Sequence, residues 1–213
     1  VRRASGVFML RTSRGDLMAR DVIVATNGYS GPVVPALRRR IVPVGSCLIA
    51  TAPLGPSVAR ALLRRDRVVS DTRHLLSYFR ISTDTRMLFG GRVAFGPVRG
   101  FDGAKRLTET MCALFPRLLG TDIDYHWSGT VAMTMDQLPH AGVRDGLHYA
   151  MGYNGHGVAL ATYLGARVGQ ALAGGDDLRP FADRPFQAVP MHFGHPWFLP
   201  LVGAYYRLKD ALR

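Results

Sequence analysis

Several features are scarce in this chain of 213 residues, and each scarcity excludes a class of protein. Two cysteines, Cys47 and Cys112, cannot form a disulfide framework or a cysteine-rich metal site. No apolar run approaches the roughly 18 residues of a membrane span, so we expect no transmembrane segment. The start, Val1 to Arg3, lacks the pattern of a secretory signal. We therefore expect a reducing compartment, the cytoplasm.

Lysine is also scarce, although the formal net charge is +12. Only Lys105 and Lys209 are lysines, and the arginines are scattered apart from the short runs at 38–40 and 64–65. No alternation of aromatic and basic residues marks a platform for stacked bases. We therefore expect no nucleic-acid partner, because an arginine-rich coding bias or the binding of acidic small molecules explains the charge equally well.

What is present indicates a globular mixture of helices and strands. Hydrophobic residues make up 47% of the chain, enough to bury a core. Residues 7–12 and 16–20 predict strands around a turn, and the apolar run 22–25 predicts a strand buried on both faces, as in a parallel sheet. No parallel neighbour precedes it, so we expect a partner region outside this chain or on another one.

The middle of the chain predicts an antiparallel layer. Strands are expected at 41–52 and 125–133, with a hairpin formed by 75–82 and 86–92. Helices are expected at 57–63 and 104–115, the second with Leu107, Met111, Leu114 and Phe115 facing the core. At the carboxy-terminal end, Leu201, Tyr205, Leu208 and Leu212 follow helical spacing. This segment is interpreted as packing on its own domain or on a missing half, with an anionic membrane surface as the alternative.

The most informative stretch joins a predicted strand, 147–151, to a predicted helix, 158–172, through the glycine-rich turn Gly152-Tyr-Asn-Gly-His-Gly157. Glycines permit close approach of a ligand, and a helix N-terminus favours negative charge. The turn suits a phosphate or the carbonyl edge of a flavin ring. It departs from the dinucleotide motif G-x-G-x-x-G, because Leu160 takes the last position. The alternative interpretation is a tight connection without a ligand.

Several segments, taken in order, resemble the D-amino-acid-oxidase-like FAD oxidoreductases. Residues 21–29 (DVIVATNGY) resemble the family's second flavin segment, and 152–157 resemble its carboxy-terminal flavin loop. The tail at 203–210 is similar to the branch of gamma-glutamylputrescine oxidoreductases. Further matches, in family order, are found at 32–52, 89–92, 127–129 and 136–139. The family opens with a G-x-G-x-x-G segment for the FAD pyrophosphate, which this sequence lacks.

The resemblance implies an α/β fold that mixes a partial FAD-binding sheet domain with an antiparallel substrate-domain sheet, without the amino-terminal dinucleotide-binding βαβ unit. The implied boundaries are 1–30 for the end of the FAD-binding domain, 31–125 for the substrate domain, 126–178 for the return to the FAD-binding domain and 179–213 for the tail. The implied reaction is hydride transfer from the CH–NH group of an amine or amino acid to flavin N5. Alternatives are a truncated non-catalytic fragment and a subunit that needs a separate chain carrying the phosphate-binding half.

The resemblance also implies site residues. FAD would contact Ala25, Thr26, Asn27, Gly28, Gly129, Asn154, Gly155, His156, Gly157 and Val158. The alternative for His156 is simple packing at the turn. Tyr78 or Arg80 would orient the substrate, although an exposed hairpin edge explains them equally well. The catalytic residue is not identified, and no metal site is expected, since His192-x-x-His195 has no third ligand.

Overall fold

The computed structural model describes residues 1–4, 6–94, 100–175, 178–192 and 196–212. The chain forms two compact units, each built from two separate stretches. The first unit contains Val1–Pro43 and Val131–Pro196, and the second contains Val44–Thr130 and Trp197–Arg213. None of the described helices combines the length and apolar character that a membrane span requires. Mixed helices and antiparallel sheets confirm the predicted fold class.

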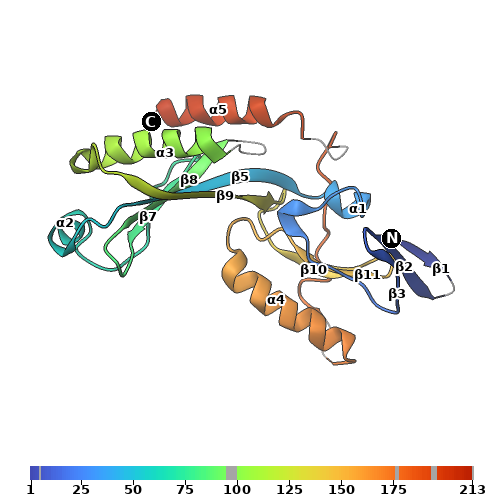
Figure 1. The fold of residues 1–213 in the computed structure, drawn as a ribbon. Coiled ribbons are helices and arrows are strands. Elements are labelled where there is room, and N and C mark those ends of the chain that lie inside the picture. Colours follow the sequence, from blue (N-terminus) through green and yellow to red (C-terminus); the bar gives the residue numbers. More distant parts are fainter. Residues whose placement is uncertain (5, 95–99, 176–177, 193–195, 213) are drawn as a thin grey trace. The chain divides into compact units, whose positions relative to one another are not determined.

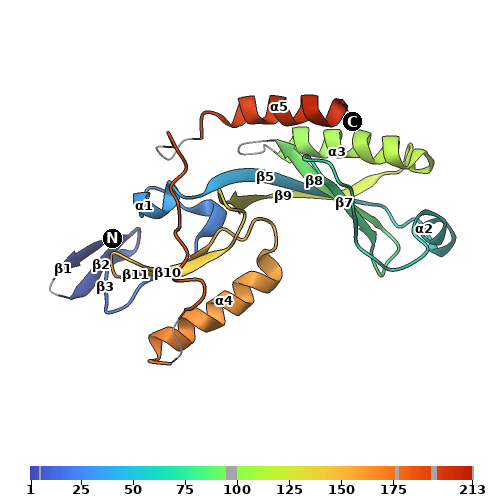
Figure 2. The same ribbon diagram turned by 180° about the vertical axis from the view of Figure 1, so that it is seen from behind.

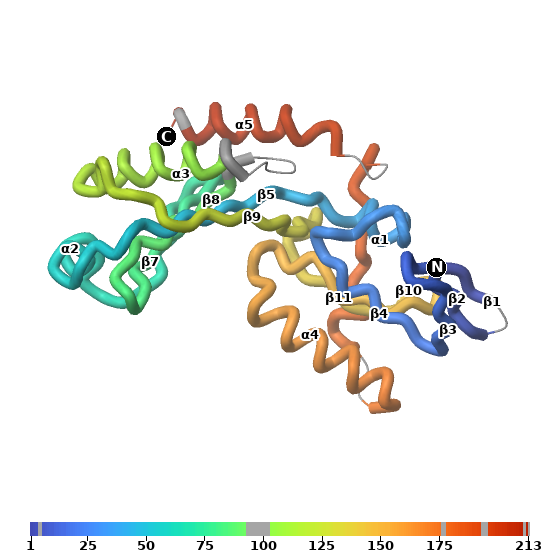
Figure 3. Tube along the Cα trace, viewed as in Figure 1, coloured from blue at the N-terminus to red at the C-terminus, as the bar shows by residue number. Residues whose placement is uncertain are grey.

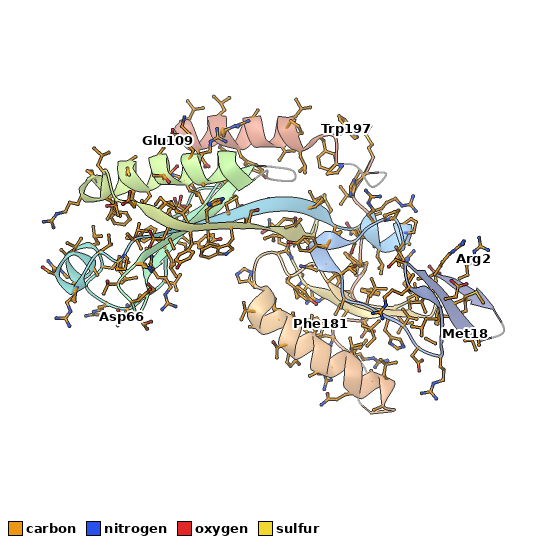
Figure 4. The ribbon with its side chains drawn as sticks, in the orientation of Figure 1. Arg2, Met18, Asp66, Glu109, Phe181 and Trp197 are labelled. Carbon is orange, nitrogen blue, oxygen red and sulfur yellow. The ribbon has the colours of Figure 1, made fainter. Side chains whose placement is uncertain are left out.

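The first unit carries two small sheets, with strand orders β1-β2-β3 and β10-β11-β4. Its strands are β1 (Arg2–Ala4), β2 (Val7–Thr12), β3 (Gly15–Ala19), β4 (Ile23–Val24), β10 (His140–Arg144) and β11 (Leu147–Met151). Its helical elements are η1 (Asn27–Tyr29), α1 (Pro35–Arg38) and α4 (Gly157–Leu172). The predicted hairpin at the start is confirmed, with Met9 opposite Met18 on β2 and β3. Met18, labelled in Figure 4, is exposed.

Strand β4 is shorter and more open than its apolar run predicts. Val24 is buried, whereas Ile23 is 48% exposed, so the expectation of burial on both faces is wrong for Ile23. The parallel neighbour of β4 within this chain is β11, which follows it by more than a hundred residues, with Tyr149 opposite Val24. Figure 3 shows the two strands together. The pairing holds the middle of the first stretch of this unit against the second stretch.

Helix α4 packs on the β10-β11-β4 sheet through its apolar face. Leu164 and Val168, one turn apart, are fully buried against Ala150 and Tyr153. Burying a side chain of this size stabilises a fold by about 1.5–3 kcal/mol. Phe181, labelled in Figure 4, lies edge-on to Tyr163 of this helix. The start of α4 is therefore fixed relative to the end of β11.

The second unit is a five-stranded sheet, in the order β6-β7-β8-β5-β9, together with helices (Figure 2). Its strands are β5 (Val42–Thr51), β6 (Val69–Ser70), β7 (Ser77–Ile81), β8 (Met87–Ala94) and β9 (Ile123–Met133). The divisions between the two units fall inside β5 and β9, after Pro43 and after Thr130. The helices are α2 (Pro56–Leu62), α3 (Gly100–Leu114), η2 (Pro116–Leu118) and α5 (Leu199–Ala211). The predicted hairpin is confirmed as β7 and β8, which pair antiparallel.

The core of the second unit lies between the sheet and α3. Phe89 of β8 and Met111 of α3 are fully buried, and Leu107 is nearly so. Phe115 packs against the same cluster, whereas Leu114 is 50% exposed, so its predicted place in the core is wrong. Helical spacing alone does not separate two adjacent apolar residues at the edge of a stripe.

Helix α5 is attached to the rest of the second unit by a carboxylate. Asp210 accepts hydrogen bonds from the backbone N–H of His74 (3.1 Å) and of Leu75 (3.0 Å), and its Oδ1 lies 2.9 Å from Nδ1 of His74. The His74 ring also stacks on Tyr206. The predicted apolar stripe is solvent-facing instead of packed on this domain, with exposures of 59–79% for Leu201, Tyr205, Leu208 and Leu212.

Candidate functional site

The chain turns sharply after β4, at residues predicted to contact a cofactor. Ala25 and Thr26 are exposed, and Asn27 adopts a left-handed conformation with φ of 44°. The hydroxyls of Thr26 and Ser30 lie 2.7 Å apart, and the Tyr29 N–H donates to the Thr26 carbonyl. Asparagine tolerates this backbone conformation better than most residues. The turn is therefore ordered by its own hydrogen bonds, while its outer edge remains open.

The second turn, which follows β11, has a more unusual backbone. Gly152, Asn154 and Gly155 all have positive φ values, of 76°, 52° and 97°. The Asn154 side chain is buried and links the turn to Thr134, accepting a hydrogen bond from the Thr134 N–H (2.9 Å) and donating one to the Gly152 carbonyl (2.6 Å). Asn154 is thus a residue that shapes the turn from inside.

A side chain of the first turn holds the second. The Asn27 Oδ1 accepts a hydrogen bond of 2.9 Å from the Gly152 N–H, although the two residues are 125 positions apart. The bond lies directly beyond the parallel pairing of β4 with β11, so both turns stand at the carboxyl ends of parallel strands. In open α/β sheets, ligands characteristically bind at this edge. Two of the segments predicted to contact FAD are therefore neighbours within one unit.

The start of α4 presents a positive, open surface beside these turns. Hydrogen bonding within the helix begins with the Leu160 N–H, which donates to the His156 carbonyl at 3.2 Å. The preceding amides, of Gly157, Val158 and Ala159, belong to the first turn and have no partner inside the helix. Their partial positive charges favour an electron-rich group. Val158 is 96% exposed and His156 is also exposed, so neither side chain is buried by the described part of the chain.

The predicted substrate residues lie on one face of the sheet in the second unit. Ser77, Phe79 and Ile81 alternate with them along β7 and face the core. The hydroxyl of Tyr78 lies 3.0 Å from that of Ser46 on β5. Tyr78 also lies across Gly90, where an added Cβ would come within 2.4 Å of the ring. A side chain at position 90 would displace the phenol.

Arg80 is exposed on the same strand. Its Nε donates to the Ile81 carbonyl at 3.3 Å. Gly129, the remaining residue predicted to contact FAD, lies exposed on β9. Both residues belong to the second unit.

Asp136 and His140 form a close pair without features of a catalytic centre. His140 is 1% exposed, stacks on Phe186 and places Nε2 3.1 Å from the Asp136 carboxylate. Burial alone would raise the pKa of Asp136, but the hydrogen bonds from His140 and from the Leu138 N–H lower it below its usual value. The pair joins the loop before β10 to the core.

Other residues that the sequence singles out are structural. Cys47 is buried in the core of the second unit, and burial raises the pKa of its thiol, as expected of an unreactive cysteine. His192 is buried, with Nε2 3.0 Å from the Ile41 carbonyl, while His195 lies outside the described residues. Among the described residues, no group of three or more His, Cys, Asp or Glu is placed to hold a metal ion.

Comparisons with known proteins identify a matching family and curated relatives of this chain. Residues 1–171 match the model of the family described as FAD dependent oxidoreductase. The chain is 36% identical to the gamma-glutamylputrescine oxidoreductase of Escherichia coli K12 over 96% of its length and 49% of that protein's. It is also 36% identical to the probable oxidoreductase OrdL of Haemophilus influenzae, over 81% of its length and 40% of that protein's.

Solved structures show the same fold at lower identity. Glycine oxidase from Geobacillus kaustophilus matches with a TM-score of 0.65 and 21% identity, covering 84% of this chain and 49% of that one. L-proline dehydrogenase from P. horikoshii matches with a TM-score of 0.63 and 20% identity, covering 81% and 48%. The chain thus spans about half the length of the relatives that it matches. Because the family model covers most of the chain, this chain belongs to the FAD dependent oxidoreductases.

Proposed function

We propose that this chain supplies the ring-facing part of an FAD site in an oxidoreductase that acts on the CH–NH group of an amine or amino acid. The observation that carries the proposal is the hydrogen bond between Asn27 and Gly152, which joins two cofactor-type turns at the carboxyl ends of β4 and β11. Membership of an FAD dependent family supplies the identity of the cofactor. The gamma-glutamylputrescine oxidoreductase similar to this chain motivates the amine substrate.

The described residues fit a flavin ring in shape and charge. Gly155 has no atom within 4 Å of an added Cβ, so the turn leaves open space where a planar ring system approaches. When bound, FAD would accept a hydride from the carbon next to the substrate nitrogen. The first-turn amides of α4 would stabilise the negative charge that reduction places near the ring's pyrimidine end. In this proposal Ala25 to Gly28 flank the cofactor on one side, and Gly155 to Val158 flank it on the other.

Substrate orientation is assigned to the open face of β7. Arg80 offers a forked set of N–H donors that matches a carboxylate, and Tyr78 offers a hydroxyl already positioned by Ser46. Gly129 stays a predicted cofactor contact. The pyrophosphate-binding G-x-G-x-x-G segment is assigned to polypeptide outside this chain, because the chain spans about half of each curated relative.

The purified chain tests this assignment through its flavin absorption. We expect weak or absent FAD binding by the chain alone, and yellow protein when it is co-expressed with the part of the Escherichia coli relative that it does not cover. Yellow protein from the chain alone would indicate a self-sufficient cofactor site. Colourless, aggregating protein under both conditions would favour a non-catalytic fragment. Among the described residues β4 is the last strand of its sheet, and an open strand edge promotes aggregation.

Replacing Asn27 by alanine should weaken flavin binding about tenfold in the complemented protein. The substitution removes the acceptor of the Gly152 N–H and places alanine at a positive φ, so the two turns lose their mutual alignment. Asn27→Asp retains a side-chain oxygen at the same position and serves as the matched control. Fluorescence titration of FAD measures both affinities, and equal affinities for the alanine variant and the original protein would contradict the proposed site.

Replacing Arg80 by methionine should raise the KM for the amine or amino-acid substrate at least tenfold, with a smaller effect on kcat. Methionine keeps most of the side-chain length but removes the donors that would hold the substrate. Arg60→Met, an exposed arginine of α2, controls for the loss of a positive charge. Steady-state kinetics on the complemented protein measures the effect, and an unchanged KM would remove Arg80 from the site.

A further inference from the structure

The second unit contains a pocket that is separate from the residues assigned above. It has a volume of about 410 Å³, within the size range of small-molecule sites. Its lining residues come from the loop before β7, from β8, from the middle of α3 and from the end of α5. Figure 1 labels these elements. Leu75, Leu76 and Leu107 contribute apolar lining.

Four arginines from four different elements line this arginine pocket. Arg73 comes from the loop before β7, Arg92 from β8, Arg106 from α3 and Arg207 from α5. Arg73, Arg106 and Arg207 are exposed, whereas Arg92 is half-buried. Residues far apart in the sequence are thus brought together with the same charge, and like charges at short range repel one another.

Two described carboxylates, those of Asp210 and Asp71, are already engaged by backbone N–H groups beside the pocket. Asp210, which also lines the pocket, is occupied by the N–H groups of His74 and Leu75 and by the His74 ring. Asp71 accepts hydrogen bonds from the N–H groups of Arg73 (3.2 Å) and Ser77 (3.1 Å). Over the described ranges of the chain, no carboxylate lies within salt-bridge distance of the guanidinium groups of Arg73, Arg92 or Arg207.

Arg92 shows the consequence of this arrangement most clearly. Burial lowers the pKa of its guanidinium, and among the described residues the opposing influences are the phenols of Tyr78 and Tyr206. A partly buried cation without an anionic partner is costly, and a bound anion offsets the cost.

We propose that the arginine pocket binds a small molecule through its carboxylate or phosphate oxygens. Guanidinium groups bind such oxyanions with paired N–H donors, and several converging on one pocket add both affinity and geometric selectivity. The leucines accommodate a short apolar portion of the ligand. This site is independent of the proposed FAD site, because none of its lining residues is assigned to the flavin or to the substrate.

Calorimetric titration of the chain with inorganic phosphate and, separately, with succinate tests the proposal at constant ionic strength set with sodium chloride. We expect saturable one-to-one binding of at least one of these anions. The anion that binds more tightly identifies the phosphate or the carboxylate as the natural ligand group. Binding of neither anion, or heat that does not saturate, would overturn the proposal.

Paired variants locate the binding. Arg73→Gln with Arg207→Gln should weaken anion affinity at least tenfold, whereas Arg60→Gln with Arg64→Gln removes the same charge from exposed positions elsewhere in this unit and should leave it unchanged. Arg73→Lys with Arg207→Lys keeps the charge but not the forked donors, and we expect an intermediate, several-fold loss. This lysine pair tests the site even if the glutamine pair does not fold. An equal loss in the control pair, or none in either pocket pair, would contradict the site. The titrations contain no flavin, so their outcome is independent of FAD binding.

Discussion

Replacing Gly152 by alanine should destabilise the chain by roughly 3 kcal/mol, the largest effect that we expect from a single methyl group. Two costs combine at this position. The backbone has φ of 76°, which an L-residue adopts at a cost of about 1–2 kcal/mol. An added Cβ would also approach Cγ2 of Thr134 to 2.4 Å, and overpacking of this kind costs about 1–3 kcal/mol. Urea-induced unfolding, followed by circular dichroism, measures the change in the free energy of unfolding.

Gly155 provides the matched control for this substitution. It lies three residues away with φ of 97°, but an added Cβ there has no atom within 4 Å. Gly155→Ala should therefore cost only the backbone contribution, about 1–2 kcal/mol. Equal losses for the two variants would show that Thr134 moves to accommodate the added methyl. This result would contradict a destabilising contact between Thr134 and a side chain at position 152.

Replacing Asp210 by alanine should destabilise the second unit by about 3 kcal/mol and release α5. The substitution removes an ionised acceptor from two backbone N–H groups and from His74. A hydrogen bond to a charged group contributes about 1.5–3 kcal/mol, and the N–H groups left without an acceptor are partly buried. Asp66→Ala, at an exposed position of the same unit labelled in Figure 4, is the control. Limited proteolysis near residue 197 reports release of the helix, and equal resistance of the two variants would contradict this role.

The same carboxylate predicts a direction for the dependence of stability on pH. Hydrogen bonds from the Leu75 and His74 backbone and from the His74 ring lower the pKa of Asp210 to about 2, despite the opposing effect of burial. Its contribution to stability is therefore complete above the ordinary pKa of 3.8 and is lost as the pH falls toward 2. Unfolding midpoints measured between pH 5 and pH 2 should converge for the original chain and Asp210→Asn, and parallel curves would contradict the assignment.

Local patterns predicted most elements of the fold, because these elements depend on neighbouring residues. The hairpin of β2 and β3, the strand β11 and the helix α4 all follow from periodicity and glycine placement. The exposure of Ile23 could not be predicted from the sequence, because a strand's apolar content does not reveal which neighbours cover it. The exposure of the apolar stripe of α5 could not be predicted for the same reason.

The candidate site could be predicted only in its separate parts. The glycine-rich turn near Gly155 carries a visible signal, and so does the apolar strand that precedes Asn27. The hydrogen bond between Asn27 and Gly152 leaves no signal in the sequence, because 125 positions separate the two residues. Ser46 beside Tyr78 and the need for glycine at position 90 likewise depend on strand register, which pairs Tyr78 with Gly90 across the sheet.

The long separation between Asn27 and Gly152 also has a kinetic meaning. Ribosomes add roughly 5–20 residues per second, so the first turn emerges about 6–25 seconds before its partner. During that interval the whole hairpin of β7 and β8, whose contacts are short in sequence, has time to form. The first unit can close only afterwards, because its two stretches must meet across a long intervening segment whose loop-closure entropy slows the step. We therefore expect the sheet of the second unit to gain protection from hydrogen exchange first during refolding, and the pairing of β4 with β11 last.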